Sequence, residues 1–463
     1  MPTESSRRIE ILRRELRPTL RLALPLVLAE IGWMSMGIVD TIMVGRLPNS
    51  AVAIGAVSLG QSLYYAVAIF GSGLLLGLDT LVSHAFGRND LDDARHSLIN
   101  SLAIALTLMP ILMVIVSFWP ELMQRLGVAP PVLREMKPFL TALNWSTPPL
   151  LLYFAMRRYL QAVHVVRPIT FALISANIVN ALGNWIFIYG HWGAPALGVP
   201  GSGWSTCGAR LYMASVMVAT LLYSNRKRNL RLFDAGLSIE WARVRRLLAL
   251  GFPAATQILL EMGAFSAAAA LIAKLGAVPL AAHQIALNCA ALTYMVPLGT
   301  SSAAAVRVGH ALGRGNLRAA RRAGWTAILL GAGFMCCAGL VFVSVPGQIA
   351  RIFSPDPAVI RTGVTLLLIA AAFQLFDGLQ TVATGALRGA GDTRTPMIAN
   401  FLAYWVIGLP VGYVLCFRWG WGAPGIWIGL CLGLIVVGST LLGAWHRRMH
   451  PRAAVGEPLE ATE

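Results

Sequence analysis

Twelve apolar runs, each close to the length that crosses a lipid bilayer, constrain the fold of this chain more than any other feature. A transmembrane helix needs about 20 predominantly apolar residues. The 463 residues are 57% hydrophobic and only 12% charged, whereas soluble chains carry roughly 25% charged residues. The sequence therefore predicts an all-α polytopic membrane protein. The runs lie at about residues 20–45, 52–80, 97–119, 138–163, 169–190, 203–223, 248–273, 280–306, 323–345, 362–387, 396–417 and 424–445.

The net charge of +17 comes from Lys and Arg residues that lie mostly between the apolar runs. This distribution argues against a nucleic-acid-binding protein, which gathers basic residues on one face. Basic residues are enriched in cytoplasmic loops, and most fall on one side when both termini are cytoplasmic. Arg157 and Arg158 are counted with this cytoplasmic set, and Arg210 is left near a span end. The pattern predicts an even number of spans.

An internal repeat indicates that the chain has two similar halves. The segment VSHAFGRNDLDDARH at 82–96 matches VGHALGRGNLRAARR at 308–322. Pro25 recurs as Pro253, and the tetrapeptide WGAP at 192–195 returns at 421–424. Because each half holds an even number of spans, both enter the membrane from the same side. We expect 12 transmembrane helices in two parallel six-helix lobes with a central cleft.

The same reasoning predicts five segments along the chain. A basic amphipathic amino-terminal segment precedes the first lobe, a cytoplasmic linker joins the lobes, and a cytoplasmic tail follows the second. Their ranges are 1–20, 21–223, 224–247, 248–445 and 446–463.

Four acidic residues lie inside apolar runs, where an ionisable side chain costs roughly 2.5–3.5 kcal/mol. They are Glu30, Asp40, Glu261 and Asp377. A protonated carboxyl that stabilises helix packing is the favoured interpretation for Glu30. Glu261 and Asp377 instead lie in polar or small-residue settings, and two converging carboxylates suit a bound Na⁺ or a shared proton. We therefore expect this pair to bind the coupling cation, and to form a metal site if that cation is Na⁺.

The fifth apolar run carries a stripe of asparagines. Asn177, Asn180 and Asn184 have the spacing i, i+3, i+7, which places them on one helical face. Hydrogen bonds between packed helices are one explanation. The other is a polar pocket of the amino-terminal half, next to Asp40. Both interpretations stay open at this stage.

The motifs reached so far resemble the multidrug and toxic compound extrusion (MATE) transporters, particularly the NorM-like branch. The resemblance extends over nearly the whole chain, from about residue 21 to 445. It is carried by GIVDTIMVG around Asp40, LGNWIFIYG around Asn184, AAHQIALN and VRVGHALG at 281–288 and 306–313, and FQLFDGLQTVATGALRGAGDTR at 373–394. It implies a twelve-helix, two-lobe antiporter of the bacterial cytoplasmic membrane that exports organic cations in exchange for Na⁺ or H⁺.

The resemblance also assigns roles to residues. Glu261 and Asp377 match the family's carboxy-lobe cation site. Asp40, a third expected cation-binding residue, matches the family's first-helix aspartate, and Asn180 and Asn184 match its polar partners. Two departures from the pattern stand out. Some relatives have a carboxylate where this chain has Asn184, and some have a tyrosine where it has Phe373.

Glu30, Phe373 and Gln374 are candidate substrate contacts. The expected partners are amphipathic, mostly cationic drugs and membrane lipid, and the expected state is a monomer. No cofactor is expected beyond the coupling ion, and the sequence does not choose between Na⁺ and H⁺.

Two other functions fit the sequence less well than drug export. A lipid-precursor flippase of the same architecture would need a basic cleft for phosphates, whereas the central ionisable groups of this chain are acidic. An enzyme would need a catalytic constellation, and the sequence contains no HExxH, GxSxG or Walker-type motif.

Overall fold

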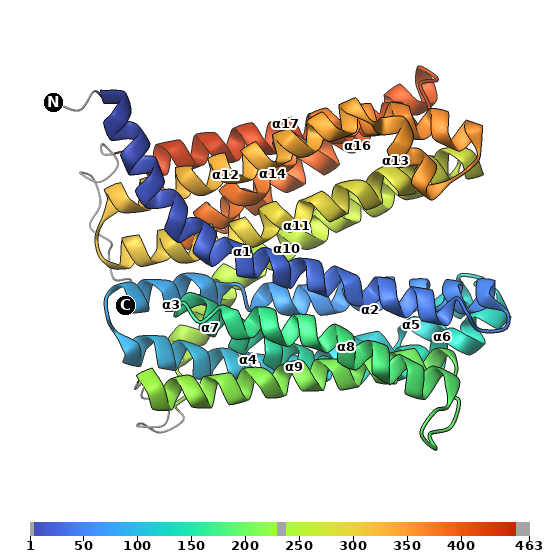
Figure 1. Cartoon of the computed structure of the whole chain (residues 1–463), viewed down its shortest axis with the longest axis horizontal. Coiled ribbons are helices and arrows are strands. Elements are labelled where there is room, and N and C mark those ends of the chain that lie inside the picture. Colours follow the sequence, from blue (N-terminus) through green and yellow to red (C-terminus); the bar gives the residue numbers. More distant parts are fainter. Residues whose placement is uncertain (1–3, 229–237, 451–463) are drawn as a thin grey trace. The chain divides into compact units, whose positions relative to one another are not determined.

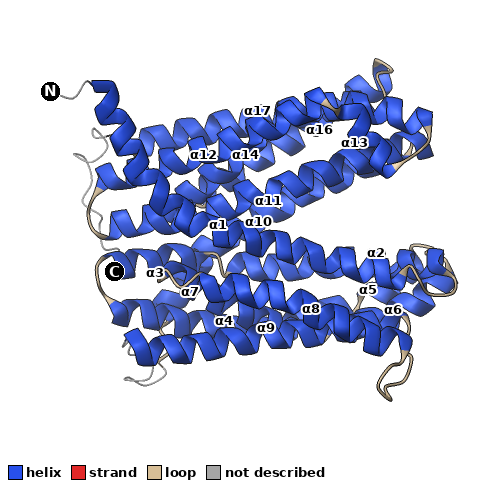
Figure 2. Ribbon diagram, viewed as in Figure 1, coloured by secondary structure: helices blue, strands red, loops and turns tan. Residues whose placement is uncertain are grey.

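The computed structural model describes residues 4–228 and 238–450, and within these ranges the chain is helical, with no β-strand. Within each of its two compact parts, long helices run side by side, as Figure 1 and Figure 2 show. The predicted all-α, many-span fold is confirmed. The helices are α1 (Glu4–Val44), α2 (Ser50–Leu74), α3 (Gly77–Gly87), α4 (Leu91–Ser117), α5 (Trp119–Arg125), α6 (Pro130–Asn144), α7 (Thr147–Ala162), α8 (Arg167–Tyr189), α9 (Val199–Arg228), α10 (Trp241–Ala273), α11 (Ala277–Gly313), α12 (Leu317–Ser344), α13 (Pro346–Phe353), α14 (Pro357–Gly389), α15 (Arg394–Asn400), the π-helix η1 (Phe401–Gly408), α16 (Leu409–Tyr413), the π-helix η2 (Val414–Arg418) and α17 (Ala423–Arg448).

Eleven helical segments of the described chain are long and apolar enough to cross a membrane. The predicted span at 138–163 is not among them, because it forms two shorter helices, α6 and α7. The break has a simple cause. Pro148 and Pro149 open α7, and neither can donate the backbone hydrogen bond that would continue α6.

The chain divides into two compact units, which we describe separately. The N-unit comprises Leu28–Ala255, and the C-unit comprises the described residues of Met1–Val27 and Thr256–Glu463. The helices α1 and α10 therefore each contribute one part to each unit. In the C-unit, α14 packs along α11, α12 and α17, and in the N-unit α8 packs along α9.

The predicted segment boundaries stay predictions, but the helices differ from them in detail. The basic start of the chain is not a separate helix, because α1 runs without interruption from Glu4 into the first span. The helices α9 and α10 extend into the predicted linker from either side. The middle of that linker, 229–237, and the tail after residue 450 lie outside the described residues.

Candidate ion and substrate sites

Two carboxyls of the C-unit meet at one amide group. Glu261 lies on α10 and Asp377 on α14, and the side chain of Gln380 stands between them. Its Nε2 donates to Glu261 Oε1 at 2.9 Å and to Asp377 Oδ1 at 3.3 Å. Sequence reasoning predicted that the two carboxyls converge, and the structure brings them to the same donor.

This pair has no basic partner in the described part of the chain: no Lys, Arg or His there forms an ion pair with either carboxyl. Asp377 is only 5% exposed, and its negative charge repels that of Glu261. Two like charges in a dry interior do not both ionise unless a cation compensates them. The pair therefore has the electrostatics of a site that takes up a proton or a monovalent metal ion.

Two neutral oxygen atoms that could act as cation ligands lie near these carboxyls. The Oε1 atom of Gln380 and the hydroxyl of Tyr404 are buried and have no hydrogen bond within the described structure. Tyr404 lies close enough to Glu261 and Asp377 for an electrostatic interaction with both. Hard cations prefer such oxygen ligands. Among the described residues, no group of three or more His, Cys, Asp and Glu side chains could hold a metal ion. Tyr404 lies on η1. It was not predicted as a site residue, because the sequence of one apolar run does not show which of its side chains face the carboxyl pair.

Phe373 and Gln374, two predicted substrate contacts, are packed inside the C-unit. The ring of Phe373 lies 6.0 Å from that of Phe265 and 5.7 Å from that of Trp427, between ring centroids. Gln374 Nε2 donates to Thr293 Oγ1 at 2.6 Å. Both side chains are at most 2% exposed.

Asp40 is the centre of a hydrogen-bonded cluster in the N-unit. Its Oδ1 accepts from Asn184 Nδ2 at 2.7 Å, and its Oδ2 accepts from Thr206 Oγ1 at 3.0 Å. Asn180 joins through its Oδ1, 3.4 Å from Asn184 Nδ2. Asn177 does not join this cluster. Its Nδ2 instead donates to the backbone oxygens of Gly32 and of Leu173 one turn back.

A buried arginine, Arg210, stands near Asp40 and was missed as a site residue. It lies on α9 one turn beyond Thr206, is 1% exposed and attracts the Asp40 carboxylate. Its guanidinium lies 4.9 Å from the ring centroid of Tyr64 and donates to Ser146 Oγ. The sequence predicts that Arg210 lies near the end of a span. The structure shows that its side chain is buried inside the N-unit.

Glu30 forms a buried ion pair with Arg157. Arg157 and its neighbour Arg158, which the distribution of basic residues assigned to the cytoplasmic side, lie on α7 and contact acidic residues of other helices. Arg158 Nη1 lies 3.4 Å from Asp79 Oδ2 of α3. Glu30 and Arg157 are 127 residues apart in sequence and lie on different helices, so the sequence alone does not reveal the pair.

Comparison with known proteins places the chain in a family. The family model MatE matches it twice, at residues 25–186 and 253–414. It is 38% identical to the "Probable multidrug resistance protein NorM" of Mesorhizobium japonicum, over 94% of each chain. It is 34% identical to the "Multidrug resistance protein MdtK" of Yersinia enterocolitica, over 91% of this chain and 93% of that one. Among solved structures, "Outward-facing conformation of a multidrug resistance MATE family transporter of the MOP superfamily" superposes with a TM-score of 0.86 at 17% identity, covering 99% of this chain and 100% of that one.

Proposed function

This chain belongs to the MatE family and is a multidrug efflux transporter, and we propose that it works as an antiporter coupled to Na⁺ or H⁺. In this proposal it exports amphipathic, mostly cationic drugs by alternating access. It does so as a monomer in the bacterial cytoplasmic membrane, with both termini cytoplasmic. The observation that carries the proposal is the Glu261–Asp377 pair, two carboxyls that share the amide of Gln380 and have no basic partner among the described residues.

The coupling cation binds between Glu261 and Asp377. With the pair empty, one carboxyl must hold a proton or leave an uncompensated charge, because both lie in a medium of low dielectric. A proton entering from outside satisfies the pair directly. A sodium ion does the same if the unpartnered oxygens of Gln380 and Tyr404 complete its ligands. A cation that binds one conformation of the transporter better than the other shifts the equilibrium between them, and this couples its entry to drug exit.

Asp40 is the proposed cation-binding residue of the N-unit, with Asn180 and Asn184 as its polar partners. It differs from the C-unit pair in two ways. Its carboxylate already accepts hydrogen bonds from Asn184 and Thr206. In addition, Arg210 supplies a positive charge nearby. We therefore assign the larger part of cation binding to Glu261 and Asp377.

Glu30, Phe373 and Gln374 remain proposed substrate contacts, and the structure sets conditions on each. A drug cation reaches the Glu30 carboxylate only by replacing Arg157 as its partner. Phe373 and Gln374 are buried, so a drug touches them only after neighbouring side chains have moved.

The test is efflux of a fluorescent organic cation from proteoliposomes, driven separately by a Na⁺ gradient and by a pH gradient. We expect one gradient to drive efflux by the wild type, and Glu261→Gln and Asp377→Asn each to lose that efflux while staying folded. Glu121→Gln is the matched control, because Glu121 is an exposed carboxylate paired with Arg125. Full efflux by both C-unit variants would refute the site assignment.

A further inference from the structure

An exposed apolar groove of about 620 Å³ runs along one side of the N-unit. One wall is α2, with Phe70 and Leu74, and the other is the first three turns of α10, from Trp241 to Phe252. Every lining side chain except Arg245 is apolar. Trp241 is 80% exposed and Phe252 is 55% exposed. No function assigned above uses this groove.

Close backbone contact fixes the two walls. A Cβ atom at Gly73 would lie 2.7 Å from the Cα of Ala255, and one at Gly77 would lie 2.6 Å from the backbone oxygen of Leu247. Only glycine allows α2 and α3 to approach α10 this closely. The rings of Phe70 and Phe252 meet edge to face, with centroids 6.0 Å apart. The groove is therefore preformed by packing.

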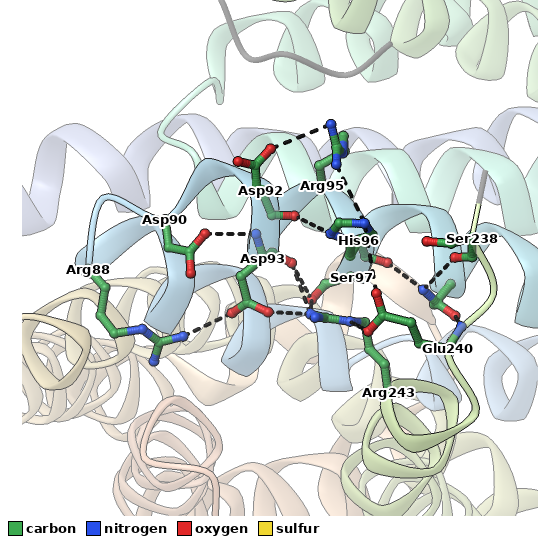
Figure 3. A network of polar contacts seen from close by, with 11 residues as sticks. Arg88, Asp90, Asp92, Asp93, Arg95, His96, Ser97, Ser238, Glu240 and Arg243 are labelled. Carbon is green, nitrogen blue, oxygen red and sulfur yellow. Dashed lines mark hydrogen bonds and ion pairs between the residues drawn. The ribbon is translucent and has the colours of Figure 1, made fainter. Parts of the chain in front are cut away.

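A polar network holds the start of α10 in place, as Figure 3 shows. Arg243 donates to the carboxylate of Asp93 on α4, and its Nε donates to Glu240 Oε2 at 3.0 Å. The backbone N–H of Glu240 donates to Asn100 Oδ1 at 2.8 Å. These contacts neutralise Arg243 and fix the helix turn that carries the groove's basic residue.

Arg245 is the one charged side chain among the described residues that line the groove. It is exposed, as is its neighbour Arg246, and no described residue forms an ion pair or hydrogen bond with either. Arg243, two residues earlier, has two acidic partners. A positive charge beside an apolar groove attracts an anion with an apolar tail and repels an organic cation. The positive charge of Arg245 therefore makes this groove unsuitable as a binding site for cationic drugs.

The length of the groove fits one lipid leaflet. The twelve residues from Trp241 to Phe252 rise about 16 Å along the helix, and half of a bilayer's hydrocarbon core is about 15 Å thick. Trp241, at one end, belongs to a residue type enriched where hydrocarbon meets the headgroups. Basic groups between transmembrane helices are known to bind anionic headgroups.

We propose that this groove is a binding site for an anionic phospholipid of the surrounding bilayer. One acyl chain lies between α2 and α10, and the phosphate contacts Arg245. This proposal is independent of the coupling ion and of the exported drug, so it stands or falls on lipid binding alone.

The test is native mass spectrometry of the purified full-length chain, titrated with phosphatidylglycerol and, separately, with phosphatidylcholine of the same acyl chains. We expect tighter binding of phosphatidylglycerol. Arg245→Gln should weaken it about five-fold, as expected for loss of one basic residue near a lipid phosphate, and Arg245→Lys should retain it. Ala249→Phe should also weaken it, because Ala249 lines the groove and the larger ring fills it.

Arg246→Gln is the matched control, since it removes the same charge one residue away and does not line the groove. Equal weakening by Arg245→Gln and Arg246→Gln would show that diffuse charge, and no site, attracts the lipid. Equal binding of the two lipids, or unchanged binding by Ala249→Phe, would also overturn the proposal. Thermal unfolding of each variant in detergent confirms that the comparison is made between folded proteins.

Discussion

Four carboxyls within the long apolar helices of this transporter have different surroundings, and these surroundings separate their roles. Glu30 pairs with Arg157, and Asp40 lies near Arg210. Glu261 and Asp377 share an amide and have no basic partner in the described chain. The sequence showed all four as ionisable groups inside apolar runs. It did not show their partners, because these lie on other helices and come together only through packing.

The ion pair between Glu30 and Arg157 predicts a large asymmetry between single and double variants. Arg157→Gln leaves Glu30 buried without its partner, and breaking a buried pair costs about 3–5 kcal/mol. Glu30→Gln with Arg157→Gln removes both charges and should cost less than Arg157→Gln alone. Thermal unfolding of the purified variants measures this. A double variant less stable than Arg157→Gln would show that the two charges are not coupled.

The amide of Gln380 predicts a specific effect on coupling. Gln380→Leu keeps the size of the side chain but removes the donor that both carboxyls share, so we expect weaker cation-driven efflux from a folded protein. Gln348→Leu is the control, because Gln348 is an exposed glutamine on α13 of the same unit and has no contact with the carboxyl pair in the described structure. Equal losses in the two variants, measured as initial efflux rates, would argue against a role for the shared amide.

At the scale of helices, apolar run length predicted the spans well and the contacts between them poorly. Eleven helical segments of the described chain are long and apolar enough to cross a membrane. The exception, 138–163, breaks between Asn144 and Thr147, just before Pro148 and Pro149 in the first turn of α7. These prolines are visible in the sequence, but the prediction of a single span rested on the length of the apolar run. The asparagine stripe was read correctly as a polar face, yet only Asn180 and Asn184 join Asp40, because Asn177 lies opposite Gly32.

The start of α10 is predicted to depend on the contact between Arg243 and Asp93. Both side chains are partly exposed, at 19% and 25%, so solvent screens the pair and its loss should cost about 1 kcal/mol or less. Hydrogen exchange of the amides from Trp241 to Val244 should become faster in Arg243→Gln and in Asp93→Asn. Unchanged exchange in both variants would show that packing alone holds this turn.

At the scale of the whole chain, the two halves repeat in sequence but differ in polar content. The family model matches them at 25–186 and 253–414, an offset of 228 residues (253 − 25). At that offset Glu261 and Asp377 correspond to Trp33 and Pro149. The halves therefore share a scaffold, and only the C-unit has an acidic pair without a basic partner in the described chain. The repeat and the family were predictable from sequence, whereas the buried arginines of the N-unit required the structure.

The central claim is that the coupling cation binds between Glu261 and Asp377 and leaves when the drug binds. The most direct measurement is the number of cations released per drug molecule bound by the purified protein, counted with radioactive Na⁺ and with a pH dye in weak buffer. We predict release of one kind of cation by the wild type and by Glu121→Gln, and only a small fraction of that release by Glu261→Gln or Asp377→Asn. Release by these two variants equal to that of the wild type would contradict the claim.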